Sequence, residues 1–394
     1  MSPKTTEHNK PPFYALYIGI FLLAFHSALP LYITSSFLST YFSDTTVGFL
    51  YAGASLLTLI ILTRLSRILN RFGNRRTALF FVFLEMLAFA GLAYFKAWYL
   101  VLPVFVMSQI LVSLILFNFD VFFESFSKDA TTGSLRGTML TVFNTAILLG
   151  PLTTGIILSD GDYYKVFLVA LALLVPVFWI LLTRLHDFKD ARYEHVDYLK
   201  TLRRVVFARH PDDIIRHVVI ANLLLHFFFS WMVVYMPLYL HTNLGFSWAE
   251  IGVIFTIMLL PFVLFEAPVG KIADARGNEI FFIKTGFLIT AFFTGILAFI
   301  ASSALPLWAL LLFGTRVGMS FVEVASESYF FKHINATNTN VLSVFRNARP
   351  IAYLAGPATA SILLFVIPIN YLFAALALVM LYGAWNARTL EKIS

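Results

Sequence analysis

The strongest constraint on this chain is a series of apolar runs, each about 20 residues long, that recurs along its length. An α-helix of about 20 apolar residues crosses the roughly 30 Å hydrocarbon core of a bilayer. Hydrophobic residues make up 59% of the chain and charged residues only 12%, whereas a soluble domain carries about 25% charged residues. The sequence therefore predicts an all-α integral membrane protein.

The distribution of basic residues supports twelve transmembrane helices. If the N-terminus lies in the cytoplasm, 22 of the 28 Lys and Arg fall in cytoplasmic segments and only two, Lys96 and Lys165, in outer loops. Such a bias is typical of cytoplasmic loops, so we attribute the formal net charge of +7 to topology and not to nucleic-acid binding. We expect both termini in the cytoplasm and the chain in the plasma membrane. The predicted spans are 13–42, 46–63, 77–95, 101–126, 137–158, 164–184, 214–240, 249–270, 280–301, 306–330, 341–366 and 370–388.

A segment of about forty residues occurs twice, in residues 119–158 and 322–364. Both copies contain two acidic residues four positions apart and, further on, a Gly-Pro step. The first copy has Asp120, Glu124 and Gly150-Pro151, and the second has Glu323, Glu327 and Gly356-Pro357. Internal repeats of this kind occur in transporters built from similar halves. We predict two pseudo-symmetric six-helix bundles, at 1–184 and 214–394.

The segment between the predicted bundles, residues 185–213, is rich in basic residues. Apolar residues recur in it at helical spacing, with basic residues on the opposite side. This pattern predicts an amphipathic helix on the inner membrane surface, and a solvated basic linker is the alternative.

Two loops match each other at an offset of 204 positions, residues 66–76 and 270–279. They resemble the signature of the major facilitator superfamily, which reads Gly, three residues, Asp, a basic residue, any residue, Gly and further basic residues. The second loop keeps Gly270, Asp274 and Gly277, whereas the first keeps Arg71 and Gly73 but has Ser66 for the first Gly and Asn70 for Asp. The resemblance implies a gate on the cytoplasmic side. We assign to it Asn70, Arg71, Gly73, Gly270, Asp274, Gly277, Glu124, Glu327, Arg346 and Arg349.

The Gly-Pro steps match only in part a signature found in the fifth span of the family's proton-coupled exporters, Gly-x-x-x-Gly-Pro-x-x-Gly-Gly. The first copy has Ala146 and Thr154 where that signature has glycine, and the second copy has a similar series of small residues. Small residues allow helices to approach closely in lipid. Because both halves share the pattern, we favour a role in packing and bending over an export-specific signature.

Polar residues inside the predicted spans are candidates for function, because buried ionisable groups are costly in a membrane. Spans four and ten carry equivalent polar stripes, and the resemblance implies that spans one, four, seven and ten line a central path. Candidates for the substrate path are Gln109, Ser113, Asn222, Ser230, Arg316 and Ser320. Candidates for proton coupling are Asp120, Glu323, His26 and His226. The alternative is that these charges form structural ion pairs, for example Glu323 with Arg346 or Arg349. Glu85, in span three, is predicted to be peripheral.

The sequence contains no phosphate-binding Gly-rich loop, no nucleophile–base or metal-ligand cluster and no cysteine. We therefore expect neither an enzyme nor a bound cofactor or metal. The expected function is secondary active transport by a monomer, with proton-coupled export of a small amphiphilic or organic compound as the leading hypothesis. One alternative is a proton symporter or exchanger for a polar or anionic metabolite with Arg316 as its anchor. Another is a transport-inactive scaffold or sensor on the same fold.

Overall fold

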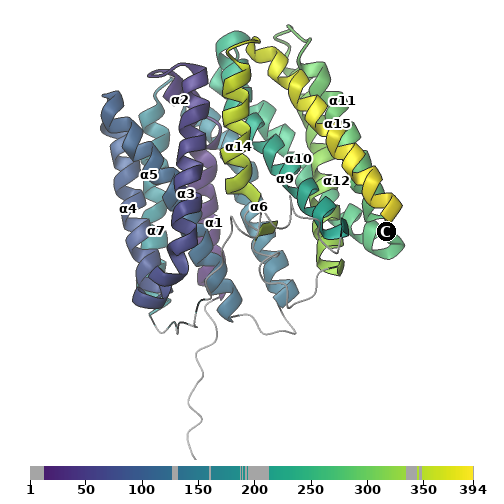
Figure 1. Cartoon of the computed structure of the whole chain (residues 1–394). Coiled ribbons are helices and arrows are strands. Elements are labelled where there is room, and N and C mark those ends of the chain that lie inside the picture. The colour runs from purple at the N-terminus through teal and green to yellow at the C-terminus, as the bar shows by residue number, and fades with distance from the viewer. Residues whose placement is uncertain are drawn as a thin grey trace, which may run out of the picture.

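The structure is a computed structural model that describes residues 13–126, 132–158, 161–186, 188, 190, 193, 213–333, 344–345 and 348–393. In this part of the chain the regular structure is helical and no strand occurs (Figure 1). The elements are α1 (Phe13–Leu31), α2 (Thr34–Ser39), α3 (Asp44–Phe72), α4 (Asn74–Tyr94), α5 (Trp98–Phe126), α6 (Thr132–Ile157), α7 (Tyr163–Thr183), α9 (Asp213–Leu238), the π-helical turn η1 (Tyr239–Asn243), α10 (Trp248–Arg276), α11 (Glu279–Leu297), α12 (Leu305–His333), α14 (Ala348–Leu363) and α15 (Ile369–Ile393).

The first predicted span, 13–42, is divided into α1 and α2. Pro30 has no backbone N–H to donate, and its carbonyl oxygen accepts hydrogen bonds from the Ile33 N–H at 3.1 Å and the Thr34 hydroxyl at 2.7 Å. The prediction of one continuous helix is wrong here, because the apolar composition continues through the break.

Eleven described helices are long and apolar enough to cross a membrane. The predicted span 341–366 corresponds to α14, of which the structure describes 16 residues, fewer than a membrane crossing requires. The rest of its predicted start lies largely outside the described residues, as does most of the predicted amphipathic linker. The integral membrane class is therefore established, and the exact count of twelve stays a prediction.

The helices fall into an N-terminal set, α1 to α7, and a C-terminal set, α9 to α15 (Figure 1). In the first set α4 packs on α5 and α7, and α1 packs on α6 and α7; in the second α11 packs on α12 and α15, and α9 packs on α14 and α15. The sets meet where α3 packs on α14 and α6 packs on α10. We call the end of the molecule where α1 begins and α15 ends the terminal end, and the opposite end the far end.

Both contacts between the sets depend on glycine near the far end. A Cβ on Gly48 of α3 would lie 2.8 Å from the Pro357 carbonyl oxygen of α14, and one on Gly252 of α10 would lie 2.7 Å from the Pro151 carbonyl oxygen of α6. A real Cβ is not found so close to a backbone oxygen, so only glycine permits these helix approaches. The glycine of each helix set therefore packs against the Gly-Pro segment of the other set, Gly48 on Pro357 and Gly252 on Pro151. This agrees with the packing interpretation of the sequence.

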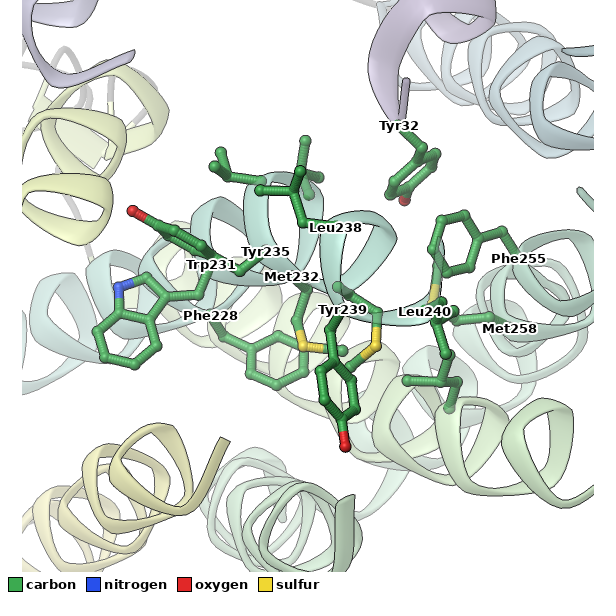
Figure 2. Close-up of a cluster of buried hydrophobic side chains, with 14 of the residues drawn as sticks. Tyr32, Phe228, Trp231, Met232, Tyr235, Leu238, Tyr239, Leu240, Phe255 and Met258 are labelled. Carbon is green, nitrogen blue, oxygen red and sulfur yellow. The ribbon is translucent and has the colours of Figure 1, made fainter. Parts of the chain in front are cut away.

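The hydrophobic core is continuous across the two sets only toward the far end. One cluster joins Leu29, Tyr51 and Phe105 of the N-terminal set with the interior of the C-terminal set. Figure 2 shows part of this cluster, in which Tyr32, directly after α1, lies beside Phe255 of α10, with ring centroids 4.6 Å apart. At the terminal end, the described residues of the two sets form separate clusters.

Candidate functional site

A cavity of about 340 Å³ lies between the N-terminal and C-terminal sets. Its lining begins near Tyr32 and Tyr51 and continues toward the terminal end, where Glu266, Glu323 and Arg349 line it. The glycine contacts lie beyond it at the far end, and members of the shared core such as Tyr51 and Phe105 form part of its wall. The described residues of the two sets thus close the cavity on the far side, whereas at the terminal end they form separate clusters.

The two walls of the cavity differ in charge. Every ionisable Asp, Glu, Lys, Arg or His that lines it in the described part of the chain belongs to the C-terminal set: His226, Glu266, Arg316, Glu323 and Arg349. The polar residues that line the N-terminal wall are uncharged: Ser27, Tyr32, Thr34, Tyr51, Ser55, Thr58, Ser108, Gln109, Ser113 and Asn144. A charged solute in this cavity would therefore be recognised mainly by the C-terminal set.

Arg316 is the most deeply buried charge in the cavity wall, with a side chain only 1% exposed. Its guanidinium carbon lies 5.0 Å from the ring centroid of Phe228 and 5.1 Å from that of Phe229. The side chains of Tyr32 and Glu323 also interact with it. Even so, the Nε and Nη1 atoms are buried and have no hydrogen-bond acceptor among the described residues. The site therefore holds a desolvated cation with unused donors.

A cluster of three carboxylates lies on the terminal side of this cation, and Glu323 is the member that interacts with it. Glu323 of α12 interacts with Glu266 of α10, with Glu327 one turn further along α12, and with Arg316. Glu266 and Glu323 line the cavity, whereas Glu327 is exposed and does not. Two carboxylates of this cluster therefore belong to the cavity wall.

Two further ionisable side chains complete the charged wall. His226 of α9 donates from Nδ1 to the Asn222 carbonyl oxygen at 3.0 Å, which leaves Nε2 as its second titratable nitrogen. Arg349 of α14 is exposed, and its guanidinium carbon lies 5.5 Å from the Tyr353 ring centroid.

Of the predicted path residues, Gln109, Ser113 and Arg316 line the cavity and the other three do not. Asn222 donates from Nδ2 to the Phe345 carbonyl oxygen at 2.8 Å. Ser230 and Ser320 donate to carbonyl oxygens one turn earlier in their own helices. These three polar groups are used in helix packing and helix geometry.

The predicted proton-coupling residues are dispersed. Glu323 and His226 line the cavity. Asp120 is exposed near the terminal end of α5 and is not part of the lining, and the same is true of Glu124. Arg136, near the start of α6, is in the sequence a candidate ion-pair partner of both carboxylates, and its side chain lies outside the described part of the structure.

His26 is buried one layer behind the cavity wall, with a side chain 0% exposed. Its Nδ1 donates to the Ala170 carbonyl oxygen at 2.9 Å, and its Nε2 lies 3.4 Å from Oε1 of Glu85. Glu85 is also 0% exposed and accepts a hydrogen bond from the Ser108 hydroxyl at 2.8 Å. Glu85 is therefore not peripheral, although the sequence analysis predicted so, because the face of α4 that carries it packs against α5 and its side chain reaches His26 of α1.

The first signature loop is tied to the segment that follows α7. Asn70 donates from Nδ2 to the Tyr193 carbonyl oxygen at 2.8 Å and accepts from the Tyr193 N–H at 3.0 Å. Asp190 accepts from the Asn74 N–H at 2.6 Å, at the start of α4, and from the Tyr193 hydroxyl at 2.7 Å. Burial and this bond to Asp190 raise the pKa of the Tyr193 hydroxyl. Asp190 thus brings a carboxylate to a loop whose own acidic position is Asn70.

The other predicted gate residues occupy simpler surroundings. Gly73 and Gly277 have positive φ, 81° and 61°, a conformation that favours glycine. Arg71 is exposed and lies over the Phe72 ring at 5.2 Å, and Gly270 packs against Val324 of α12. Arg346 and the side chain of Asp274 lie outside the described part of the structure.

The sequence analysis missed the tyrosines of the cavity, Tyr32, Tyr51 and Tyr353, together with Asn144. Tyrosine combines an apolar body with a hydroxyl, so it did not stand out in an apolar run. A search for hydroxyl-bearing residues near helix breaks such as Pro30 would have found Tyr32.

Comparisons with known proteins agree with this arrangement. The chain resembles the crystal structure of the human organic anion transporter MFSD10 (TETRAN), with 16% identity and a TM-score of 0.66 over 97% of this chain and 100% of the other. It also resembles the crystal structure of the peptide transporter POT in complex with sulfate, with 12% identity and a TM-score of 0.76 over 99% of this chain and 96% of the other. A comparison with curated protein sequences finds no match. The family model described as Major Facilitator Superfamily matches residues 16–357. The chain therefore belongs to the Major Facilitator Superfamily and is a membrane transporter, not an enzyme.

Proposed function

We propose that this transporter carries a small organic anion by alternating access, and that Arg316 binds the acidic group of the substrate. The observation that carries this proposal is the buried guanidinium of Arg316 in the cavity wall, with two nitrogens that have no acceptor among the described residues. A buried donor without an acceptor costs about 1–3 kcal/mol, and more when it is charged. A carboxylate, sulfonate or phosphate in the cavity would supply acceptors of opposite charge.

Proton coupling follows from the carboxylates beside this anchor. With Glu266 and Glu323 ionised, their charges offset those of Arg316 and Arg349 along the cavity wall. A proton on either carboxylate leaves the wall with net positive charge, which favours an anion at Arg316. Proton binding and anion binding then support each other, so the two are expected to move in the same direction across the membrane.

Alternating access is supported by the two glycine contacts. The N-terminal set, within residues 1–184, and the C-terminal set, within 214–394, act as two bundles that meet at the far end through the α3–α14 and α6–α10 contacts. Separation at the far end and closure at the terminal end would reverse the access of the cavity. With both termini in the cytoplasm of a plasma-membrane protein, as the charge bias predicts, the structure corresponds to a state open toward the cytoplasm.

A second candidate is proton-coupled export of an uncharged amphiphilic compound. The observation that favours it is the apolar part of the lining, in which Phe89, Phe105, Phe143, Phe229 and Phe262 offer rings to a ligand. An amphiphile would bind by burial of apolar surface and would depend little on Arg316. The two candidate functions therefore differ in whether ligand binding depends on Arg316, which a substitution can test.

The test is thermal stabilisation of the purified protein by a panel of small carboxylates, sulfonates, phosphates, amines and uncharged amphiphiles. We expect anions to raise the melting temperature of the wild type, since a ligand that binds the folded state stabilises it. Arg316→Gln should abolish this rise.

Lys284→Gln is the matched control, because it removes one positive charge from an ion pair with Glu391, 2.6 Å away and not part of the cavity. It should retain the anion effect. If anions stabilise Arg316→Gln as much as the wild type, or if only uncharged amphiphiles stabilise the wild type, the anion proposal fails. If the reconstituted protein transports none of the compounds that bind it, the scaffold or sensor alternative is favoured.

A further inference from the structure

The cluster of His26, Glu85 and Ser108 is the most unusual polar group of the N-terminal set, because it is buried among apolar helices and the substrate site does not use it. Both ionisable side chains are 0% exposed. Glu85 Oε2 is buried and finds no hydrogen-bond partner in the described part of the chain. A buried ionisable group inside a membrane is costly and usually has a function. The cluster therefore calls for an explanation beyond packing.

The hydrogen bonds of His26 define where its protons lie. Nδ1 faces the Ala170 carbonyl oxygen at 2.9 Å, and a carbonyl oxygen can only accept, so Nδ1 carries a proton. The other nitrogen, Nε2, faces Glu85 Oε1 at 3.4 Å. A bare Nε2 lone pair and a carboxylate would repel each other. The contact is chemically reasonable only if one proton lies on Nε2 or on the Glu85 carboxyl group.

The pair is close to the cavity but separated from it by one layer. Ser108 lines the cavity and donates to Glu85 at 2.8 Å, and Phe89 lines the cavity with its ring centroid 4.3 Å from that of His26. Neither His26 nor Glu85 is itself part of the lining. The Ser108 hydroxyl is thus the polar group between cavity water and the buried carboxyl group.

We propose that Glu85 and His26 form a proton-binding site, distinct from the substrate site, that exchanges protons with the cavity through the Ser108 hydroxyl. A proton that enters from the cavity binds the Glu85 carboxylate beside His26 Nε2, and the charge of the pair changes from −1 to 0. Release of that proton to water restores the charge of −1. No other bond forms or breaks.

The surroundings of the pair contain no competing charge in the part of the chain that the structure describes. His26 is the only ionisable side chain that acts on Glu85, and α5 and α7 present a serine hydroxyl and a backbone carbonyl oxygen. The deprotonated pair would therefore be an uncompensated buried anion, which is favoured only when water reaches it. A conformation in which water reaches Ser108 would allow Glu85 to release the proton. A conformation that excludes water from Ser108 would keep the proton on Glu85.

This site rests on the proposed transport function for its purpose, but its proton can be measured without a substrate. The experiment is infrared difference spectroscopy of the purified wild type in lipid, titrated from acidic to alkaline pH. We expect the carbonyl band of a buried protonated carboxyl group to be lost as the pH rises. Glu85→Gln should remove this band, and His26→Gln should move its midpoint by more than about one pH unit.

Two controls are needed. The first shows that the band does not come from another carboxyl group, and the second shows that the loss of any buried hydroxyl group does not slow deuterium exchange. Glu323→Gln removes a carboxyl group of the substrate cavity and should leave the band of Glu85 in place. Ser108→Ala should slow the shift of the band on exchange into deuterium oxide. Thr290→Val, which removes a buried hydroxyl between α11 and α12, should not.

A permanent ion pair would show no such band at any pH in the wild type, and a band that persists in Glu85→Gln belongs to another residue. Either result would overturn the proposal. If Glu85→Gln does not fold, the midpoint in His26→Gln decides, and an unchanged midpoint also overturns it. If anions do not stabilise the wild type but the Glu85 band still titrates, the proposed substrate class is rejected and the proposed proton site is retained.

Discussion

At the scale of single residues, the most demanding positions are glycines that have no room for a methyl group. Gly48 is the clearest, because a Cβ there would lie 1.9 Å from the Tyr235 hydroxyl, 2.1 Å from the Ser361 hydroxyl and 2.8 Å from the Pro357 carbonyl oxygen. The Tyr235 hydroxyl itself lies 3.1 Å from that carbonyl oxygen. Two side-chain hydroxyls and a backbone carbonyl oxygen thus leave no space beside Gly48, so a larger side chain must move the backbone of α3 or α14.

We predict that Gly48→Ala destabilises the protein by about 1–3 kcal/mol, the usual cost of overpacking, or shifts it toward separation at the far end. The measurements are the melting temperature and the distance between spin labels on the two helix sets. Gly53→Ala is the matched control on the same helix, since a Cβ there meets nothing within 4 Å. It should be neutral or slightly stabilising, because alanine favours helix over glycine. Equal effects of the two changes would contradict the packing argument.

At the scale of elements, the junction of α3 and α4 is held by the segment after α7. The Asp190 carboxylate accepts from the Asn74 N–H at the start of α4 and lies directly against Gly73. A carboxylate at a helix N-terminus is favoured by about 0.3–1 kcal/mol. In the family signature the acidic residue is part of the loop itself, whereas here Asn70 occupies that position and Asp190 lies 116 positions beyond Asn74.

We predict that Asp190→Ala loosens this junction, because the Asn74 N–H and the Tyr193 hydroxyl lose their shared acceptor. Hydrogen exchange at Asn74 and the amides after it should become faster, as should proteolysis of the segment after α7. Asp162→Ala is the control, since Asp162 precedes α7 at the far end and pairs with Lys165 at 3.1 Å. Unchanged exchange in Asp190→Ala would show that the carboxylate does not hold the loop.

At the scale of the whole molecule, the two helix sets share a core at the far end, whereas their described residues form separate clusters at the terminal end. The shared core and both glycine contacts lie toward the far end, and the cavity reaches toward the terminal end. The chain has no cysteine, so a single introduced cysteine can be labelled without background.

We predict that Ser113→Cys, in the cavity wall, is labelled by a membrane-impermeant maleimide from the terminal side and is protected from the far side. Asn278→Cys, in the loop between α10 and α11, is the topological control and should react from the same side. Gly48→Ala combined with Ser113→Cys should increase labelling from the far side, because it weakens the far-end contact. Labelling of Ser113→Cys mainly from the far side in the otherwise unchanged chain would rule out the direction of opening described above.

The sequence alone determined the helical membrane class and the family, because these depend on local properties. A run of apolar residues specifies a helix in lipid whatever its neighbours are, and both matched loops keep a glycine, Gly73 and Gly277. One error in the predicted spans lies where the composition is uniform but the backbone is not, at the break after Pro30 between α1 and α2.

Only the tertiary structure decided which polar residues meet. Spacing put Asp120 and Glu323 on equivalent helices, but helix rotation leaves Asp120 exposed and turns Glu323 into the cavity wall. The pairing of Glu85 with His26, 59 positions apart, and that of Asn74 with Asp190 depend on how whole helices cross and pack. A single sequence records the period of each helix, whereas the face that each helix turns to its neighbours is set by the packing of all of them together.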